Sequence, residues 1–315
     1  MLLNLLILLF TIQSGEAALQ ERYFAEVSDL VVTESGVYVA DLKMGHIIKF
    51  DQDGVEIARN GGQGRGPGEF LMGPNRLVKA GGRLLVMDQL PGSLNIFKPD
   101  LTLQEVVVDR DVFIPAYDAF YHADSLLFMA SSPIYGENFG KYNLRGGLIS
   151  AIEIYDLHGM GLRDTFTGFS TGNELALIWT YVNRLDTFTP EGEYSGTCRI
   201  STLPDEVDYE IQHFDIPTAN MTEEQAALFN KGVYLPSGQL IRGVAQTGEH
   251  LIVQYGGRFN NGTAVVINTN CEILHEFEFS ADRRIMFYDE QRSRLYYTYE
   301  LETRVGYEEL ELKRM

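Results

Sequence analysis

The sequence is poor in the residues and motifs that most directly indicate catalysis. Two cysteines, Cys198 and Cys271, occur among 315 residues, too few for a disulfide framework or a cysteine-rich zinc site. They could form one bridge in an oxidising compartment, or remain two buried thiols. The chain has no G-x-S-x-G motif, and its six histidines show no metal-ligand spacing. Binding is therefore favoured over catalysis.

Positive charge is also scarce. The chain has 25 Lys and Arg against 44 Asp and Glu, which gives a formal net charge of −19. Nucleic acids and anionic membranes are bound by surfaces rich in Lys and Arg, so neither is expected as a partner. A charge of this size keeps a protein soluble. Adaptation to salt or attraction of a cationic ligand is the alternative interpretation.

Long apolar runs are absent except at the amino terminus, where residues 2–12 are almost entirely Leu, Ile and Phe. This run is too short to span a bilayer. Small residues follow it, so we predict a signal peptide over residues 1–18, cleaved after Ala17 or Ala18, although no Lys or Arg precedes the run. A buried first strand is the alternative. We expect an exported protein of the periplasm or extracellular space, with no membrane insertion after cleavage.

What the sequence does contain is a repeat. The segment that begins at Asp29 recurs at Arg76, and the same shift of 47 residues carries residues 37–41 onto 84–88. Each copy has an apolar strand, a turn, a second strand ending in Asp, a loop containing Gly, a third strand ending in Phe, and a fourth strand. Four short strands per unit at this period are typical of a β-propeller blade.

The later units are less regular. We place them at about residues 117–166, 175–217, 240–279 and 284–313. The third unit contains an insertion at about 131–145. A short helix is predicted at about 222–231, because Thr222 can cap its start and Gly232 can end it.

The sixth unit lacks one strand, and the segment Leu19–Phe24 is an unused strand candidate. Pairing of the two chain ends would close a ring and protect an open strand edge. We therefore predict an all-β fold. Residues 19–315 would form one six-bladed β-propeller with four-stranded blades, closed by an N-terminal strand that completes the last blade. A monomer is expected.

One segment links the chain to a known family. Residues 61–70, GGQGRGPGEF, resemble the G-x-G-x-GPGEF signature of NHL-like propellers, and residues 38–41 and 47–50 fit the surrounding pattern. The chain resembles the exported six-bladed NHL-like propellers of Bacteroides-type bacteria, with specific motifs over residues 26–110. The resemblance implies a central channel. It also implies binding of proteins, peptides, glycans or nucleic acids, and enzyme activity in a minority of members.

The recurring polar residues of these units have structural interpretations. The glycine-rich run lacks the Lys-Ser/Thr ending of a phosphate loop, so we predict a tight crossing between blades in which Glu69 accepts backbone N–H bonds. Asp41 and Asp88 each end a second strand. We predict that both stabilise the following turn.

The candidate site lies where the innermost strands begin, at the channel mouth. Those positions are occupied by charged residues of both signs, namely Asp29, Arg76, Asp118, Arg242 and Arg284. Arginine can clamp a carboxylate, phosphate or sugar acid through paired hydrogen bonds. We hypothesise that Arg76 and Arg242 contact an anionic ligand. Mutual ion pairing around a water-filled channel is the alternative.

Two classes of function follow. The first is an exported binding or scaffold protein that contacts a protein, peptide or glycan through one face and the channel mouth. The second is an enzyme at the channel mouth, a lyase or a metal-dependent hydrolase. No cofactor is expected; calcium in the channel stays open, with no ligand set assigned.

Overall fold

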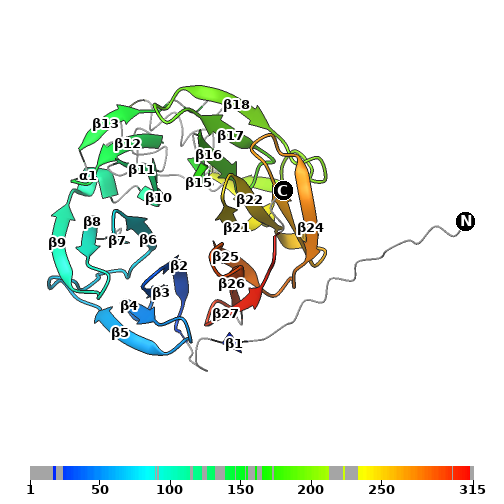
Figure 1. Ribbon diagram of the computed structural model, residues 1–315. Coiled ribbons are helices and arrows are strands. Elements are labelled where there is room, and N and C mark those ends of the chain that lie inside the picture. Colours follow the sequence, from blue (N-terminus) through cyan, green and yellow to red (C-terminus); the bar gives the residue numbers. More distant parts are fainter. Residues whose placement is uncertain are drawn as a thin grey trace, which may run out of the picture.

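The computed structural model shows an all-β propeller, as predicted. Sheets stand around a central opening, with strands such as β2 and β6 nearest the axis and β5 and β9 at the rim (Figure 1). The structure describes residues 17–18, 24–88, 90, 92–113, 116–122, 126–131, 139–145, 147–152, 154, 160–161, 165–171, 174–212, 223, 233–299 and 301–312. None of the helices described is long and apolar enough to cross a membrane.

Five antiparallel sheets each consist of four strands that follow one another along the chain. The first two are β2 (Val27–Thr33), β3 (Gly36–Asp41), β4 (His46–Phe50) and β5 (Glu56–Gly61), then β6 (Arg76–Ala80), β7 (Arg83–Asp88), β8 (Ser93–Phe97) and β9 (Leu103–Val108). The next two are β10 (Ala116–His122), β11 (Leu126–Ser131), β12 (Phe139–Asn143) and β13 (Leu148–Ala151), then β15 (Phe166–Thr171), β16 (Glu174–Trp179), β17 (Leu185–Phe188) and β18 (Tyr194–Cys198). The fifth is β21 (Ile241–Thr247), β22 (His250–Tyr255), β23 (Thr263–Ile267) and β24 (Ile273–Glu278).

The last sheet joins the two ends of the chain. It contains β25 (Arg284–Asp289), β26 (Arg294–Tyr299) and β27 (Arg304–Glu309), with β1 (Ala17–Ala18) at its outer edge. Ala17 lies opposite Tyr307 in the antiparallel register. The N-terminal segment thus pairs with this sheet, through residues that precede the predicted strand Leu19–Phe24. Residues 19–23 lie outside the described residues, and the pairing residues fall within the predicted signal peptide.

The apolar core is divided into layers between neighbouring sheets. Strands with apolar side chains on both faces pack against a sheet on each side, which explains the fully buried pattern of β3. One layer joins Val37 and Ile48 of the first sheet to Tyr296 and Val305 of the last. This contact closes the ring by packing. It is independent of the pairing with β1.

The third and fourth sheets differ from the sequence prediction. The predicted insertion at 131–145 contains β12, which lies between β11 and β13. Phe139 and Tyr142 of this strand are buried, while Gly140 and Asn143 gave no apolar alternation to recognise. The strand that begins at Leu148 is consequently the outermost one, and Phe166 begins the next sheet. Residues 132–138 lie outside the described residues.

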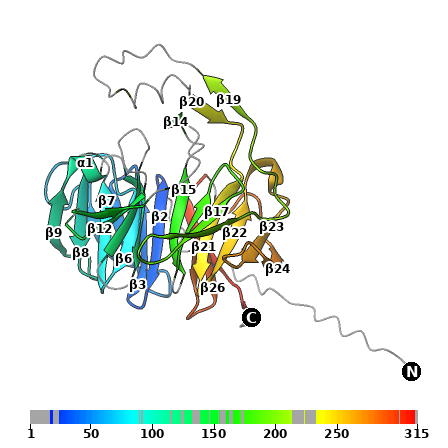
Figure 2. The same cartoon turned by 90° about the horizontal axis from the view of Figure 1, so that it is seen from above.

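A small three-stranded sheet was not predicted. It is formed by β14 (Met160–Gly161), β20 (Val233–Pro236) and β19 (Tyr209–Gln212). Figure 2 shows it beyond one face of the disc. The sequence places β19 in the fourth blade, at 175–217, but in the structure its partner is β20. The predicted helix at 222–231 lies outside the described residues, apart from Glu223, which is helical.

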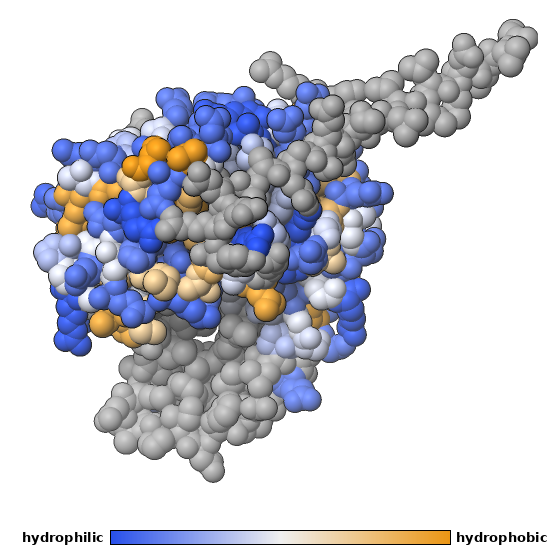
Figure 3. Space-filling view, turned by 90° about the horizontal axis from the view of Figure 1, so that it is seen from below, coloured by the Kyte–Doolittle hydropathy of each residue, from blue (hydrophilic) through white to orange (hydrophobic). Residues whose placement is uncertain are grey.

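Two short helices and one disulfide complete the described structure. The helices are α1 (Arg110–Phe113) and the 3-10 helix η3 (Gly257–Phe259). Cys198, the last residue of β18, is bonded to Cys271, in the turn between β23 and β24, with a Cα–Cα distance of 5.8 Å. The bridge connects two neighbouring sheets, whose apolar side chains share one core layer. The surface in Figure 3 is largely hydrophilic, with small separate apolar patches.

Candidate functional site

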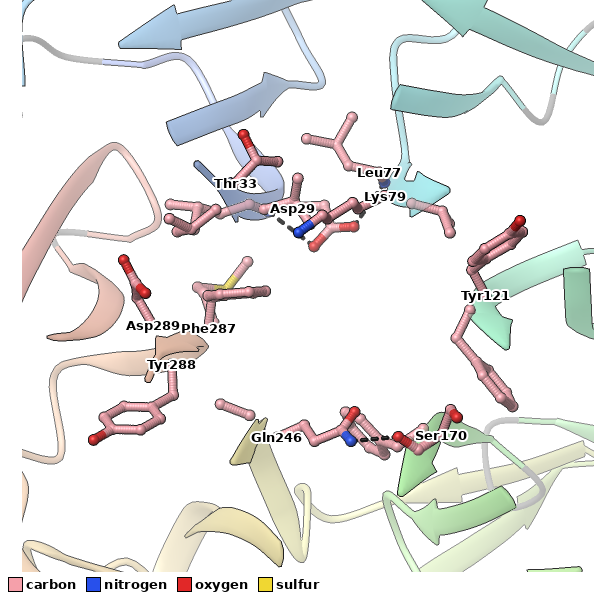
Figure 4. A pocket seen from close by; sticks show the side chains of 18 of the residues that line it. Asp29, Thr33, Leu77, Lys79, Tyr121, Ser170, Gln246, Phe287, Tyr288 and Asp289 are labelled. Carbon is pink, nitrogen blue, oxygen red and sulfur yellow. Dashed lines mark hydrogen bonds between the residues drawn. The ribbon is translucent and has the colours of Figure 1, made fainter. Parts of the chain in front are cut away.

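The central channel is the main candidate site. It has a volume of about 540 Å³ and is lined by residues from the innermost strands β2, β6, β10, β15, β21 and β25. These strands run in the same direction around the ring. Their first residues therefore lie at one end of the channel, which we call the entry end, and their last residues lie at the other, the exit end. Figure 4 shows the lining side chains around an open centre.

Three of the predicted site residues converge at the entry end. The Arg76 guanidinium lies between two carboxylates, with Nη1 3.2 Å from Asp29 Oδ2 and Nε 2.8 Å from Asp118 Oδ1. Each carboxylate also accepts a backbone N–H from the next sheet. Leu77 N donates to Asp29 at 2.7 Å, and Gly168 N donates to Asp118 at 2.8 Å. The cluster therefore joins four successive innermost strands.

Burial and charge are balanced within this cluster. Burial raises the pKa of Asp118, against the opposing effects of Arg76 and the Gly168 N–H. Burial lowers the pKa of Arg76, but the charges of Asp118 and Asp29 outweigh it, so the pKa of Arg76 is raised overall. The Arg76 side chain is 25% exposed. Its donors are directed at these two carboxylates and at the Ala119 carbonyl, to which Nε donates at 3.2 Å. This corresponds to the ion-pairing alternative.

The other two predicted residues do not join the cluster. Arg242 donates to the carbonyl of Ala281, and Arg284 Nη1 lies 2.7 Å from Glu302 Oε1. Neither is among the residues that line the channel. The five residues thus do not form one ligand site. They begin equivalent strands, but their side chains find partners in different directions.

The exit end has a different composition. Lys79 of β6, Tyr121 of β10 and Gln246 of β21 lie around the opening (Figure 4). Lys79 is exposed, and no ion pair joins it to any other residue in the described part of the chain. Gln246 Nε2 donates to Ser170 O and, at 2.9 Å, to Gly248 O. Lys79 is therefore a cation available to a ligand.

Acidic residues also occur at the exit end. Glu34 is exposed and lines the same two cavities as Lys79, whereas Asp289 and Glu290 have described partners. Asp289 Oδ2 lies 2.9 Å from Arg292 Nη1, and Glu290 Oε1 accepts the Thr247 hydroxyl at 2.8 Å. The predicted site did not include the exit end, because only the residues near the start of each innermost strand were candidates. The available signal was Lys79 itself. In the second copy of the repeat this charged residue stands at the position that Val32 occupies in the first copy.

A serine and a histidine meet beside this opening. His122 Nδ1 and Ser170 Oγ, on the adjacent strands β10 and β15, are hydrogen-bonded. Burial, followed by the positive charge of Lys141, lowers the pKa of His122. The imidazole is therefore neutral at pH 7 and can accept the serine proton. Ser170 lines the channel.

Asp41 stabilises the turn that follows its strand, as predicted, whereas the bond to Asp88 comes from the segment before its own sheet. Asp41 accepts N–H bonds from Ala25 at 3.0 Å and Met44 at 3.2 Å. Asp88 accepts one from Leu71 at 2.7 Å, and burial raises the pKa of Asp88. Both carboxylates fix the segment that leads into their own sheet. Within the described residues, no three or more His, Cys, Asp or Glu side chains are grouped to hold a metal ion.

The crossing between the first two sheets also matches its prediction. Glu69 Oε2 accepts the Gly66 N–H at 2.8 Å, and a Cβ on Gly64 would overlap the Glu69 carboxylate. Phe70 is fully buried at the end of the loop. The glycines thus permit a compact loop around one carboxylate, from the rim of one sheet to the axis of the next.

No protein-family model and no curated protein sequence matches the chain. Solved structures do resemble it. A Bacteroides fragilis protein described as a candidate exported protein has 10% identity and a TM-score of 0.60, with 93% of each chain covered. A Bacteroides thetaiotaomicron protein of unknown function also has 10% identity and a TM-score of 0.60, covering 94% of this chain and 72% of that one.

A third similar structure is an inactive variant of virginiamycin B lyase from Staphylococcus aureus, solved with quinupristin. It has 13% identity and a TM-score of 0.54, covering 94% of this chain and 98% of the lyase. At these identities the likeness establishes the fold alone. The chain is accordingly an all-β propeller, and its function has to be argued from its own residues.

Proposed function

We propose that the protein is an exported binding protein of the periplasm or extracellular space. Its fold would be a six-bladed ring in which β1 completes the last blade. Five sheets of consecutive strands, together with the sheet of β25–β27 and β1, support this count. The Cys198–Cys271 bridge fits an oxidising compartment, and a similar Bacteroides structure is described as a candidate exported protein.

The ligand would be part of a protein, a peptide or a glycan that carries a negatively charged group and enters the channel at the exit end. The observation that carries this proposal is Lys79, a cation with no ion pair in the described structure, in a protein of net charge −19. Tyr121 and Gln246 supply polar atoms nearby. A volume of about 540 Å³ lies within the range of ligand pockets, about 300–1,000 Å³.

The roles of the sequence-predicted residues change accordingly. Asp29, Arg76 and Asp118 would hold the ring together at the entry end, and the contact with an anion would pass from Arg76 to Lys79. Arg242 and Arg284 would have no direct part in binding. The partner class remains the one predicted from the sequence.

The test is calorimetric titration with two acidic probes, trigalacturonate and triglutamate, against the neutral probes maltotriose and triglutamine. We expect at least one acidic probe to bind more tightly than its neutral counterpart. Lys79→Met should weaken that binding about tenfold or more, as loss of a charge-assisted contact does. Lys98→Met, at an exposed outer turn, should leave it unchanged. Failure of all four probes to bind, or binding that Lys79→Met does not affect, would contradict the proposal.

An enzyme at the channel mouth, a lyase or a hydrolase, is the second candidate. The hydrogen bond between Ser170 and a neutral His122 favours it, because such a pair is the beginning of an activated nucleophile. A fluorophosphonate probe would then label Ser170 covalently, and Ser170→Ala would abolish the label. If no label forms at Ser170, this pair is not a nucleophile and binding remains the proposed function.

A further inference from the structure

A second candidate surface lies at the rim, between the first two sheets. Large apolar side chains are exposed there around the glycine-rich crossing, namely Leu71 (37%), Met72 (59%), Leu90 (41%), Val106 (39%) and Val108 (61%). All except Met72 line a groove of about 570 Å³. We call this the rim groove. Clustered exposed apolar residues on a soluble protein commonly mark a site of interaction.

The floor of the rim groove is one face of the second sheet. Val106 and Val108 alternate along β9, so their side chains lie on the same face. Opposite them in the register of β8 are Asn95 and Ser93. Asn95 Nδ2 donates to Ser93 Oγ at 3.2 Å. The floor thus places two exposed valines beside a buried pair of polar side chains, Asn95 and Ser93, which bond to each other.

One wall of the rim groove is the compact glycine-rich loop. The bond between Glu69 and Gly66 shapes this loop before any ligand binds. Backbone bonds from Gly64 to Phe70 and from Phe70 to Gly62, at 3.1 and 2.9 Å, secure its two ends. A pre-formed wall lowers the entropy that a ligand must lose on binding.

The charge of the rim groove is opposite to that of the whole protein. Arg65, on the loop, and Arg110, at the start of α1, both line the groove and are exposed. Neither forms an ion pair in the described structure. Glu69 is the single acidic residue of the lining, and its carboxylate accepts the Gly66 N–H. An apolar floor flanked by two arginines complements a segment that alternates aliphatic and acidic residues.

We propose that the rim groove binds an extended peptide segment of a partner protein, with aliphatic side chains on Val106 and Val108 and carboxylates beside Arg65 and Arg110. A second copy of this chain is a poorer occupant, because each copy carries a net charge of −19. The site is separate from the channel. No residue lines both cavities.

The test uses a fluorescein-labelled hexapeptide of alternating glutamate and leucine, with the glutamine-leucine analogue as its neutral control, and measures fluorescence anisotropy. We expect the acidic peptide to bind more tightly than the neutral one. Leu90→Ser with Val108→Ser should weaken binding about tenfold or more through lost apolar contact. Arg65→Gln with Arg110→Gln should remove the preference for the acidic peptide. All four positions are exposed, so folding should be retained.

The matched control is Leu148→Ser with Ile149→Ser. These residues of β13 are 50% and 53% exposed on another outermost strand, and their replacement should not change binding. Lys79→Met should also leave hexapeptide binding intact, which separates this proposal from the channel site. The proposal is overturned if the wild type does not bind the acidic peptide, if the control pair weakens binding equally, or if Lys79→Met abolishes it. A dimer in sedimentation that the Leu90 and Val108 replacements dissociate would also overturn it, because a second copy would then occupy the groove.

Discussion

At the scale of single residues, the charged side chains at the entry end show how one position supports two interpretations. A carboxylate that begins an innermost strand can bind a ligand or the N–H of the next strand. Asp29 and Asp118 do the latter, and Arg76 neutralises both. The outcome depends on the spacing between neighbouring sheets, which the order of residues along the chain does not contain. Asp41 and Asp88 were predictable because their partners lie in local turns and lead-in segments.

Replacement of Arg76 tests this structural role. Arg76→Met leaves two buried carboxylates without a counter-ion, so we expect the free energy of unfolding at pH 7 to fall by about 2–3 kcal/mol, below the full cost of a buried pair because Arg76 is partly exposed. The pKa of Asp118 is raised in the folded state. Asp118 therefore takes up a proton at a higher pH in the folded protein than in the unfolded chain. Lowering the pH through the range between these two pKa values favours folding.

The cost of Arg76→Met should accordingly shrink between pH 7 and pH 5, as judged by urea denaturation of both proteins at each pH. Arg65→Met, at an exposed position, is the control and should cost little at either pH. A loss that is the same at both pH values would contradict the assignment to uncompensated carboxylates.

At the scale of elements, the regular blades were predictable and the irregular ones were not. In the first, second and fifth sheets, apolar runs separated by Gly and Asp turns mark each strand. In the third sheet, β12 has only Phe139 and Tyr142 in the core. The small sheet pairs Met160 with Val233, two residues too far apart in the chain for any local pattern to connect. Lys79 was missed for a related reason, since its lack of a partner depends on the whole ring.

The disulfide is the strongest single link between two elements. Its two cysteines are 73 residues apart, so its loss frees a long loop in the unfolded chain. We expect Cys198→Ser with Cys271→Ser to lower the free energy of unfolding by about 2–4 kcal/mol. The measurement is urea denaturation without reductant. Dithiothreitol should destabilise the wild type by a similar amount and leave the double variant unchanged; a reductant effect on the double variant would point to another cause.

At the scale of the whole molecule, ring closure has two parts of unequal strength. Packing between the first and last sheets involves many core residues, whereas β1 adds two residues at the edge of β27. The predicted cleavage after Ala17 or Ala18 would remove that strand. A mature chain that keeps the pairing must therefore be cut before Ala17.

Hydrogen exchange can measure what β1 contributes. A chain that begins at Leu19 should fold, because the core contacts remain, but amides around Gly306 and Tyr307 should exchange faster than in the full chain. Amides of β26, inside the same sheet, should be unaffected. Equal exchange at Gly306 and Tyr307 in both chains would show that β1 gives no protection. The intact mass of the exported protein locates the actual cut.

The bridge between Cys198 and Cys271 also bears on how such a ring can diversify. The connection that leaves β18 and returns at β21 spans residues 199–240 and includes two strands of the projecting sheet. The ends of this connection belong to the ring, because Ile200, Leu203 and Val207 are buried in the core layer between the two blades. Because a covalent bond also holds these blades at the rim, the projecting strands β19 and β20 do not have to hold them together. The length and sequence of that projecting part can change, or be exchanged for a foreign recognition loop, at little cost to the ring. The bridge thus separates the part of the molecule that must stay constant from a part that is free to acquire new partners.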